Sequence, residues 1–558
     1  MDLALCGGRF DIRAVNRFHA SLIVLALWAA IFLPGLGSVE LKGEEGRRIL
    51  PAITMLDTGH WVVPYVGGKP FLRKPPLVNW MIAGAMKALG VRNEWTVRLP
   101  SVLAVLGLGL CIVSLGGDSR WMSVETALIA AIFTLTQLSM LEKGRIAEID
   151  AIYTALSGAA IAAWSASWIR GDSPWRLWLV PFLLLGFALL AKGPLHLLFF
   201  YAVVISVAWH AREWRTLLHP AHFAGILLML GIFALWWFPY HRDPATLQAG
   251  QVWQKQMEDR INGQFHFSSW ALNIPRGLSD RLPWVFFAPL LWRRDLEKLG
   301  LRDGAFFRGV RLAVVVCFFG LLLFPGVLPR YTMPLSVPFA LLLAIALSDS
   351  RMPPPSPALR FWWRTNSALA GLLLFAACAA PVALAIAERR HFFSASADES
   401  ADFAMLIAWP IVGSAGALVL CLVVLVGRRK LARPSLIACA SGALIAAAMF
   451  LYASSGTPFQ RKTEVLRPSA AVIDRFMAPQ QSLTIYDPEY QPVIFYLHVP
   501  YSYALSAESI PSGAPWVLCR KEKLDKLRHE HPDLEVAHEF QNGKLPQLVL
   551  LHRTPKAN

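Results

Sequence analysis

Long apolar stretches alternate with short polar segments over the first 455 residues of this chain. A helix needs about 20 apolar residues to cross the hydrocarbon core of a bilayer, and the pattern predicts about 13 such helices. The windows lie near residues 19–36, 98–116, 122–140, 150–168, 176–191, 194–209, 222–240, 282–292, 309–324, 332–348, 367–387, 404–426 and 434–454. The window at 282–292 is short and Lys192-Gly193-Pro194 separates two others, so the count has a margin of about one or two helices.

Two longer polar segments break this alternation. The first runs from about residue 38 to residue 96, and we expect it to contain juxtamembrane helices. The second covers residues 457–558, where short runs rich in β-branched and aromatic residues predict strands and two stretches have helical spacing. The predicted strands are Ser482–Tyr486, Pro492–His498, Trp516–Cys519 and Leu548–His552, and the predicted helices are Arg467–Phe476 and Glu522–His529.

These patterns predict an all-α, multi-pass integral membrane protein over residues 1–456 with a small C-terminal α/β domain over residues 457–558. The composition agrees, because 55% of the residues are hydrophobic, 16% are charged and the mean hydropathy is +0.46. The seven cysteines show no CxxC spacing and no adjacent histidine cluster. A structural zinc site is therefore not supported.

The positions of Lys and Arg predict the orientation in the membrane. Cytoplasmic connections are enriched in these residues. A cytoplasmic N-terminus, with Arg9, Arg13 and Arg17, places the basic stretches at 293–311 and 428–433 on the same side. Because about 13 crossings are predicted, the C-terminal domain and the segment at 38–96 then share the outer face. The first apolar window is expected to be an anchor rather than a cleaved signal peptide.

The net charge of +16 is dispersed between the apolar windows. Such a distribution fits contacts with anionic membrane lipids and with an anionic ligand. Nucleic acid is an unsuitable partner, because a nucleic-acid-binding protein gathers its cations on one face of a module.

The segment at 38–96 carries two clusters of candidate functional residues. Glu44 and Glu45 follow the first window, where paired carboxylates can act as a general base, bind a metal or cap a helix. Arg73 and Lys74 precede two prolines that hold the chain extended, and the two cations together suit a phosphate group. Cations that snorkel to the headgroup level would look the same in the sequence.

Further candidates lie near the ends of later windows. Asp150 opens the fourth window, where it fits a helix cap as well as a catalytic carboxylate. Aromatic residues near the other candidates fit an interfacial belt as well as a sugar site. The set comprises Arg145, Asp150, Lys192, Arg260, His266, Arg330 and Tyr331.

No single motif is specific, but their order along the chain resembles one family. The order is the carboxylate pair, Lys74-Pro75-Pro76-Leu77, Arg98-Leu99-Pro100-Ser101, Arg145 with Asp150, Lys192-Gly193-Pro194 and Arg330-Tyr331. It is similar to the bacterial lipid A aminoarabinose transferases and to the related protein O-mannosyltransferases. These are integral-membrane glycosyltransferases of the GT-C fold that use a sugar linked to a polyprenyl phosphate.

The resemblance implies a glycosyltransferase of the bacterial inner membrane whose outer face is periplasmic. Its donor would be an undecaprenyl-phosphate-type lipid, with 4-amino-4-deoxy-L-arabinose as the candidate sugar, and its acceptor would be lipid A, another glycan or a protein. Glu44 would be the catalytic base, supported by Glu45 and Asp150. The substrate would contact Arg73, Lys74, Arg145, Lys192, Arg260, His266, Arg330 and Tyr331.

Two positions depart from the family pattern. Glu44 stands where the family usually has Asp, and Arg73 stands where aminoarabinose transferases often carry a Glu that resembles a metal ligand. The metal site is therefore unknown, although a divalent ion stays possible. Two other functions are open: a transporter or flippase for a lipid-linked saccharide, which predicts charges near mid-span, and a non-catalytic envelope scaffold.

Overall fold

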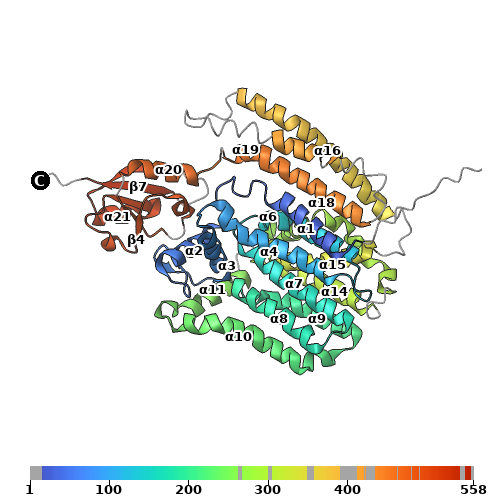
Figure 1. Ribbon diagram of the computed structural model, residues 1–558. Coiled ribbons are helices and arrows are strands. Elements are labelled where there is room, and N and C mark those ends of the chain that lie inside the picture. The colour runs from blue at the N-terminus through green and yellow to red at the C-terminus, as the bar shows by residue number, and fades with distance from the viewer. Residues whose placement is uncertain are drawn as a thin grey trace, which may run out of the picture.

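The computed structural model describes residues 15–261, 267–298, 304–348, 357–389, 411–419, 421–422, 434–461, 463–478, 481–488, 491–540 and 547–554. Long helices pack side by side over most of the chain, and a small sheet lies at one end of them (Figure 1).

Seven of the described helical stretches are long and apolar enough to cross a bilayer. They are α4 (Glu94–Leu115), α8 (Pro174–Ala191), α10 (Pro220–Arg242), α14 (Ala305–Leu322), Pro329–Ser348, Arg360–Leu384 and Pro434–Gly456. Four shorter apolar helices accompany them, namely α1 (Arg17–Phe32), α3 (Leu77–Leu89), α5 (Val124–Leu135) and α9 (Leu195–Ala211). The predicted multi-pass helical architecture is confirmed, whereas the count of about 13 spans stays a prediction.

Individual windows agree with the structure to different degrees. The window at 150–168 forms α7 (Ile149–Arg170), one of the most deeply buried helices. The window at 282–292 forms a 3₁₀-helix, η3 (Trp284–Trp292). At about 2 Å per residue, η3 is shorter than a hydrocarbon core of roughly 30 Å. Most of the window at 404–426 lies outside the described residues.

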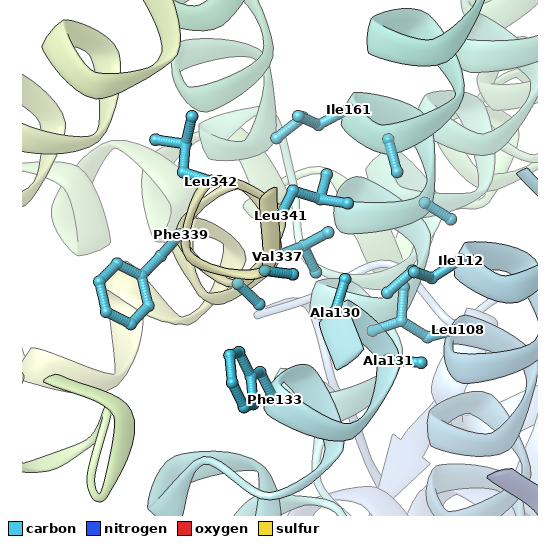
Figure 2. Packing of buried hydrophobic residues seen from close by; sticks show 14 of the residues in the cluster. Leu108, Ile112, Ala130, Ala131, Phe133, Ile161, Val337, Phe339, Leu341 and Leu342 are labelled. Carbon is cyan, nitrogen blue, oxygen red and sulfur yellow. The ribbon is translucent and has the colours of Figure 1, made fainter. Parts of the chain in front are cut away.

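The core of the helical part surrounds α15 (Ser336–Ser348), whose residues are almost all buried. Apolar side chains of α5 and α7 pack around it in Figure 2, and Leu108 and Ile112 of α4 lie beside Ala131 of α5. Gly158 of α7 lets the two helices approach, because a Cβ atom there would lie 2.3 Å from the Val337 side chain. Close packing of this kind fixes the ends of α7, which carry functional candidates.

The segment at 38–96 folds into two helices joined by a hairpin. α2 (Gly46–Thr58) ends at Gly59, which has a φ of 75°. β1 (Tyr65–Val66) pairs with β2 (Lys69–Pro70) in antiparallel fashion, and α3 follows. Asn79 of α3 donates a 2.8 Å hydrogen bond to the carbonyl of Arg48, which joins the two helices.

The last hundred residues form a five-stranded sheet with the order β4-β3-β5-β7-β6. β3 runs parallel to β4 and β5, whereas β7 runs antiparallel to β5 and β6. The strands are β3 (Leu483–Tyr486), β4 (Tyr501–Ala504), β5 (Trp516–Arg520), β6 (Leu534–Phe540) and β7 (Leu548–Arg553), with helices α20 (Leu466–Phe476) and α21 (Leu524–Glu530). The strand predicted over Pro492–His498 is wrong, because Pro492–Tyr496 forms a buried 3₁₀-helix, η7.

The sheet region is joined to the segment at 38–96 by polar contacts. The Glu40 carboxylate accepts hydrogen bonds from the backbone N–H groups of Val465, Leu466 and Arg467, at the start of α20. Glu94 pairs with Arg467 and also accepts a 2.9 Å hydrogen bond from the Tyr496 hydroxyl. Because the two regions also share one apolar core, they lie on the same side of the helical part.

Candidate functional site

A cavity of about 210 Å³ lies where helix ends meet the segment at 38–96. Its lining comes from parts of the chain that are far apart in sequence, and most of the lining side chains are charged. The residues are Glu44, Arg47, Arg48, Phe71, Arg73, Lys74, Glu148, Ile149, Asp150, Lys192, Gln256, Arg330 and Tyr331.

Helix ends place Asp150 and Lys192 next to each other. Asp150 lies in the first turn of α7 and Lys192 is the C-terminal cap of α8, so each charge suits the dipole of its own helix. Gly193, with a φ of 122°, and Pro194 then turn the chain into α9. Lys192 Nζ lies 2.5 Å from Asp150 Oδ1, and Asp150 is only 6% exposed.

Arg330 and Tyr331 complete this part of the cavity from η5 (Pro329–Leu335). Arg330 lies 3.8 Å from both Asp150 Oδ2 and Glu148 Oε2. The Lys192 ammonium lies 4.5 Å from the centre of the Tyr331 ring, a cation–π distance. Two cations therefore face the Asp150 carboxylate, and an aromatic ring lies beside one of them.

Glu148 is the most buried carboxylate of the lining, with 4% exposure. Burial raises the pKa of Glu148, although the charges of Lys143 and Arg330 oppose that rise. Lys143 Nζ lies 3.3 Å from Glu148 Oε2, and the backbone N–H of Glu44 donates a 3.3 Å hydrogen bond to Oε1. Glu148 thus joins the start of α7 to the Glu44 segment.

Glu44 and Arg48 approach the cavity from α2 and the turn before it. Both Glu44 carboxylate oxygens accept hydrogen bonds from Arg47 Nη1, at 2.9 and 2.8 Å. The Arg48 guanidinium is 7% exposed and lies 5.7 Å from the Phe71 ring centre. Burial lowers the pKa of Arg48 to about 10, so the side chain stays cationic at neutral pH.

Seven of the residues predicted from the sequence meet at this cavity, although their roles are untested: Glu44, Arg73, Lys74, Asp150, Lys192, Arg330 and Tyr331. Two others lie outside its lining. Glu45 is completely buried, and its carboxylate accepts two 2.8 Å hydrogen bonds from Arg98 and two from the backbone N–H groups of Lys42 and Ala147, at 2.7 and 2.8 Å. Arg145 donates to the backbone carbonyls of Ile31 and Pro34. In this structure both side chains therefore bind the backbone of other segments of the chain.

The remaining two predicted residues are not placed relative to the cavity. Arg260 belongs to α11 (Ala249–Ile261), and its side chain lies outside the described part of the chain. His266 also lies outside the described residues.

Four charged or polar residues of the lining were missed: Arg47, Arg48, Glu148 and Gln256. A signal existed for the two arginines, because they follow Glu44 by three and four positions and share its face on a helix. Glu148 lies two positions before Asp150, so it too was within reach. Gln256 sits on α11 without any distinguishing pattern.

The cavity carboxylates do not offer a ready metal site. Within the described ranges, no group of three or more His, Cys, Asp or Glu side chains is arranged to hold a metal ion. Each cavity carboxylate is instead paired with a cation: Glu44 with Arg47, Glu148 with Lys143, and Asp150 with Lys192. The described residues therefore do not fit a metal, and we derive no step through one.

Three kinds of similarity to known proteins agree with one another. Residues 73–237 match the family model for dolichyl-phosphate-mannose-protein mannosyltransferase. Over 335 residues the chain is 26% identical to the undecaprenyl phosphate-alpha-4-amino-4-deoxy-L-arabinose arabinosyl transferase 2 of Pseudomonas fluorescens, covering 59% of each chain. It is 29% identical over 367 residues to the corresponding transferase of Pseudomonas paraeruginosa, covering 65% of this chain and 66% of that one. The chain thus spans less than two thirds of these relatives.

The fold is similar to a solved structure over nearly the whole chain. The crystal structure of ArnT from Cupriavidus metallidurans bound to undecaprenyl phosphate has a TM-score of 0.67 and 17% identity. The similarity covers 97% of this chain and 99% of that chain. The resemblance to polyprenyl-phosphate-dependent glycosyltransferases of the GT-C fold is confirmed.

Proposed function

This chain has the fold of the GT-C glycosyltransferases, and from that premise we propose that it transfers a sugar from a polyprenyl phosphate to an acceptor. One observation carries the proposal: a charged cavity in which cations from separate elements surround ion-paired carboxylates beside Tyr331. Such a cavity suits a reaction whose leaving group is a phosphate.

The relatives' names support undecaprenyl phosphate as the donor lipid and 4-amino-4-deoxy-L-arabinose, a pentose derivative, as the first sugar to test. Lipid A is the first acceptor to test, because the motif order resembles that of lipid A aminoarabinose transferases. The same names favour a transferase over the flippase alternative.

The proposed reaction is one displacement at the anomeric carbon. An acceptor oxygen forms a bond to that carbon while its bond to the lipid phosphate breaks, and the electron pair leaves with the phosphate. Lys192 and Arg330 stabilise the charge that develops on the departing phosphate. Asp150 holds these two cations in place, since it lies 2.5 Å from Lys192 and 3.8 Å from Arg330.

The other lining residues receive roles by position. Glu44, whose side chain is 30% exposed, orients the acceptor oxygen, and it accepts the proton if that oxygen belongs to a hydroxyl group. An acceptor phosphate oxygen needs no such deprotonation. Arg73 and Lys74 contact the lipid phosphate, and Tyr331 contacts the sugar ring.

We also propose that the N-terminus is cytoplasmic and that the sheet of residues 457–558 is periplasmic, in a bacterial inner membrane. The contacts of Glu40 and Glu94 with the sheet region put this sheet on the same side as the segment at 38–96. We expect a C-terminal alkaline phosphatase fusion to be active and a C-terminal green fluorescent protein fusion to be dark. The reverse pair of results would contradict this orientation.

The function is tested with purified protein in lipid nanodiscs. The protein is incubated with undecaprenyl phosphate carrying labelled 4-amino-4-deoxy-L-arabinose and with lipid A, and the products are separated by mass. We expect label on lipid A and free undecaprenyl phosphate in equal amounts. In sealed vesicles, label that changes leaflet while still bound to the donor would identify a flippase instead.

A further inference from the structure

We infer that Arg48 forms a second oxyanion site in the cavity, which binds a phosphate or carboxylate of the substrates other than the donor's lipid phosphate. This inference rests on the proposed function and deepens it, because it restricts the substrates to pairs that carry two anionic groups.

The first support is the state of the Arg48 side chain. Its Nε and Nη1 atoms are buried, and within the described part of the chain neither has a hydrogen-bond partner. Burying an unpaired charged donor is costly, whereas a guanidinium presents a planar fork that matches an oxyanion. Arg48 lines the cavity, so a ligand there can pair with the guanidinium after a side-chain rotation, which is needed because Nε and Nη1 have almost no accessible surface.

The second support is that the cavity carboxylates are already engaged elsewhere. Both Glu44 oxygens accept from Arg47, and Asp150 lies against Lys192. Glu148 lies against Lys143 and Arg330. Among the described residues, no carboxylate lies within ion-pair distance of Arg48.

The third support is the position of Arg48 relative to the proposed phosphate cations. Arg48 comes from α2 and packs against Phe71, whereas Lys192 and Arg330 come from the end of α8 and from η5. The hydrogen bond from Asn79 to the Arg48 carbonyl fixes its backbone. Arg48 thus reaches the cavity from an element that is separate from those of Lys192 and Arg330.

The fourth support is the charge balance of the lining. Six cationic and three carboxylate side chains surround the cavity, a formal excess of three positive charges. A departing phosphate monoester carries only about 1.5 to 2 negative charges near neutral pH. Roughly one positive charge is left over, and one further anion would neutralise it.

Two sources of this anion share the same chemistry. It is either a phosphate on the acceptor or a carboxylate on an acidic sugar of the donor. A neutral sugar transferred to a neutral hydroxyl group would leave the Arg48 fork without a partner, and the inference excludes that combination.

The test measures binding of two anions to the protein in nanodiscs by isothermal titration calorimetry. Wild type, Arg48→Gln, Arg48→Lys and Lys192→Met are first titrated with undecaprenyl phosphate. At lipid saturation they are titrated with inorganic phosphate or with galacturonate. Thermal unfolding of each variant shows whether it is folded. If Arg48→Gln is unfolded, Arg48→Lys takes its place in the test.

We expect lipid-saturated wild type to bind one of the two soluble anions, and the anion that binds identifies the source. Arg48→Gln should weaken that second binding by roughly tenfold or more, with Arg48→Lys intermediate because it lacks the fork. Both variants should change lipid affinity less than about threefold, whereas Lys192→Met should weaken lipid binding.

Three results would overturn the inference. In the first, lipid-saturated wild type binds neither soluble anion. In the second, Arg48→Gln weakens the affinity for undecaprenyl phosphate as much as the affinity for the soluble anion. In the third, Arg48→Gln changes neither affinity. The last result would mean that Arg48 only packs against Phe71 and binds no anion. If wild type binds a soluble anion at Arg48 but no undecaprenyl phosphate, the site stands and the proposed function fails.

Discussion

Replacing Lys192 by methionine is expected to lower kcat for sugar transfer by about 10²–10³-fold, the usual cost of removing one preorganised group that stabilises developing charge. Methionine keeps most of the side-chain volume but removes the ammonium that lies 2.5 Å from Asp150 and 4.5 Å from the Tyr331 ring centre. The measurement is initial velocity against donor concentration. The loss should fall on kcat more than on KM, because the phosphate charge grows only as the bond breaks.

Asp150→Asn is expected to give a similar loss, since asparagine no longer pairs with the ammonium. The effects of residues that act as one unit are not additive. The kcat of the double variant should therefore be no lower than that of the less active single variant. Lys87→Met is the matched control, because Lys87 is exposed near the end of α3. Wild-type kcat in Lys192→Met, or an equal loss in Lys87→Met, would remove Lys192 from the proposed mechanism.

Replacing Arg98 by methionine is expected to destabilise the folded protein by about 3–5 kcal/mol, because it leaves a buried carboxylate without its cation. Arg98 and Glu45 are 2% and 0% exposed, and two hydrogen bonds of 2.8 Å join them. Arg98 also donates to the backbone carbonyls of Leu36, Val39 and Glu40. The measurement is thermal unfolding in detergent, followed by intrinsic fluorescence.

Lys521→Met provides the control, because Lys521 forms an exposed pair with Glu539, with side chains 48% and 47% exposed. Pairs of that kind contribute at most about 1 kcal/mol. Glu45→Gln separates structure from catalysis. If it unfolds early, Glu45 is structural, and if it stays as stable as wild type but is inactive, Glu45 returns to the set of catalytic candidates.

Much of the fold follows from composition alone, because a helix in lipid needs a long apolar run and the chain has many. Lengths were harder to predict. α5 ends at Leu135 after 12 residues. Its predicted window continues to residue 140, because the sequence stays apolar past the end of the helix. The strand predicted over Pro492–His498 failed because a short apolar run fits a buried 3₁₀-helix equally well.

The site shows the same limit at the scale of single residues. Glu44 and Glu45 are neighbours in sequence, yet one lines the cavity and the other is buried against Arg98. Neighbouring residues at a helix start point in different directions, and the sequence does not say which direction is the cavity. Asp150 and Lys192 were easier to predict, because ionisable groups at the ends of apolar windows are costly unless they are paired or functional.

The capping of α20 by Glu40 has a consequence for biosynthesis. The carboxylate and the backbone N–H groups that it accepts are 425 positions apart. At a synthesis rate of about 5–20 residues per second, roughly 20–85 s pass between the emergence of the two ends. During that interval the apolar faces of α2 and α3 that later pack on the sheet region have no partner. This apolar surface therefore exposes the protein most to aggregation before its translation is finished.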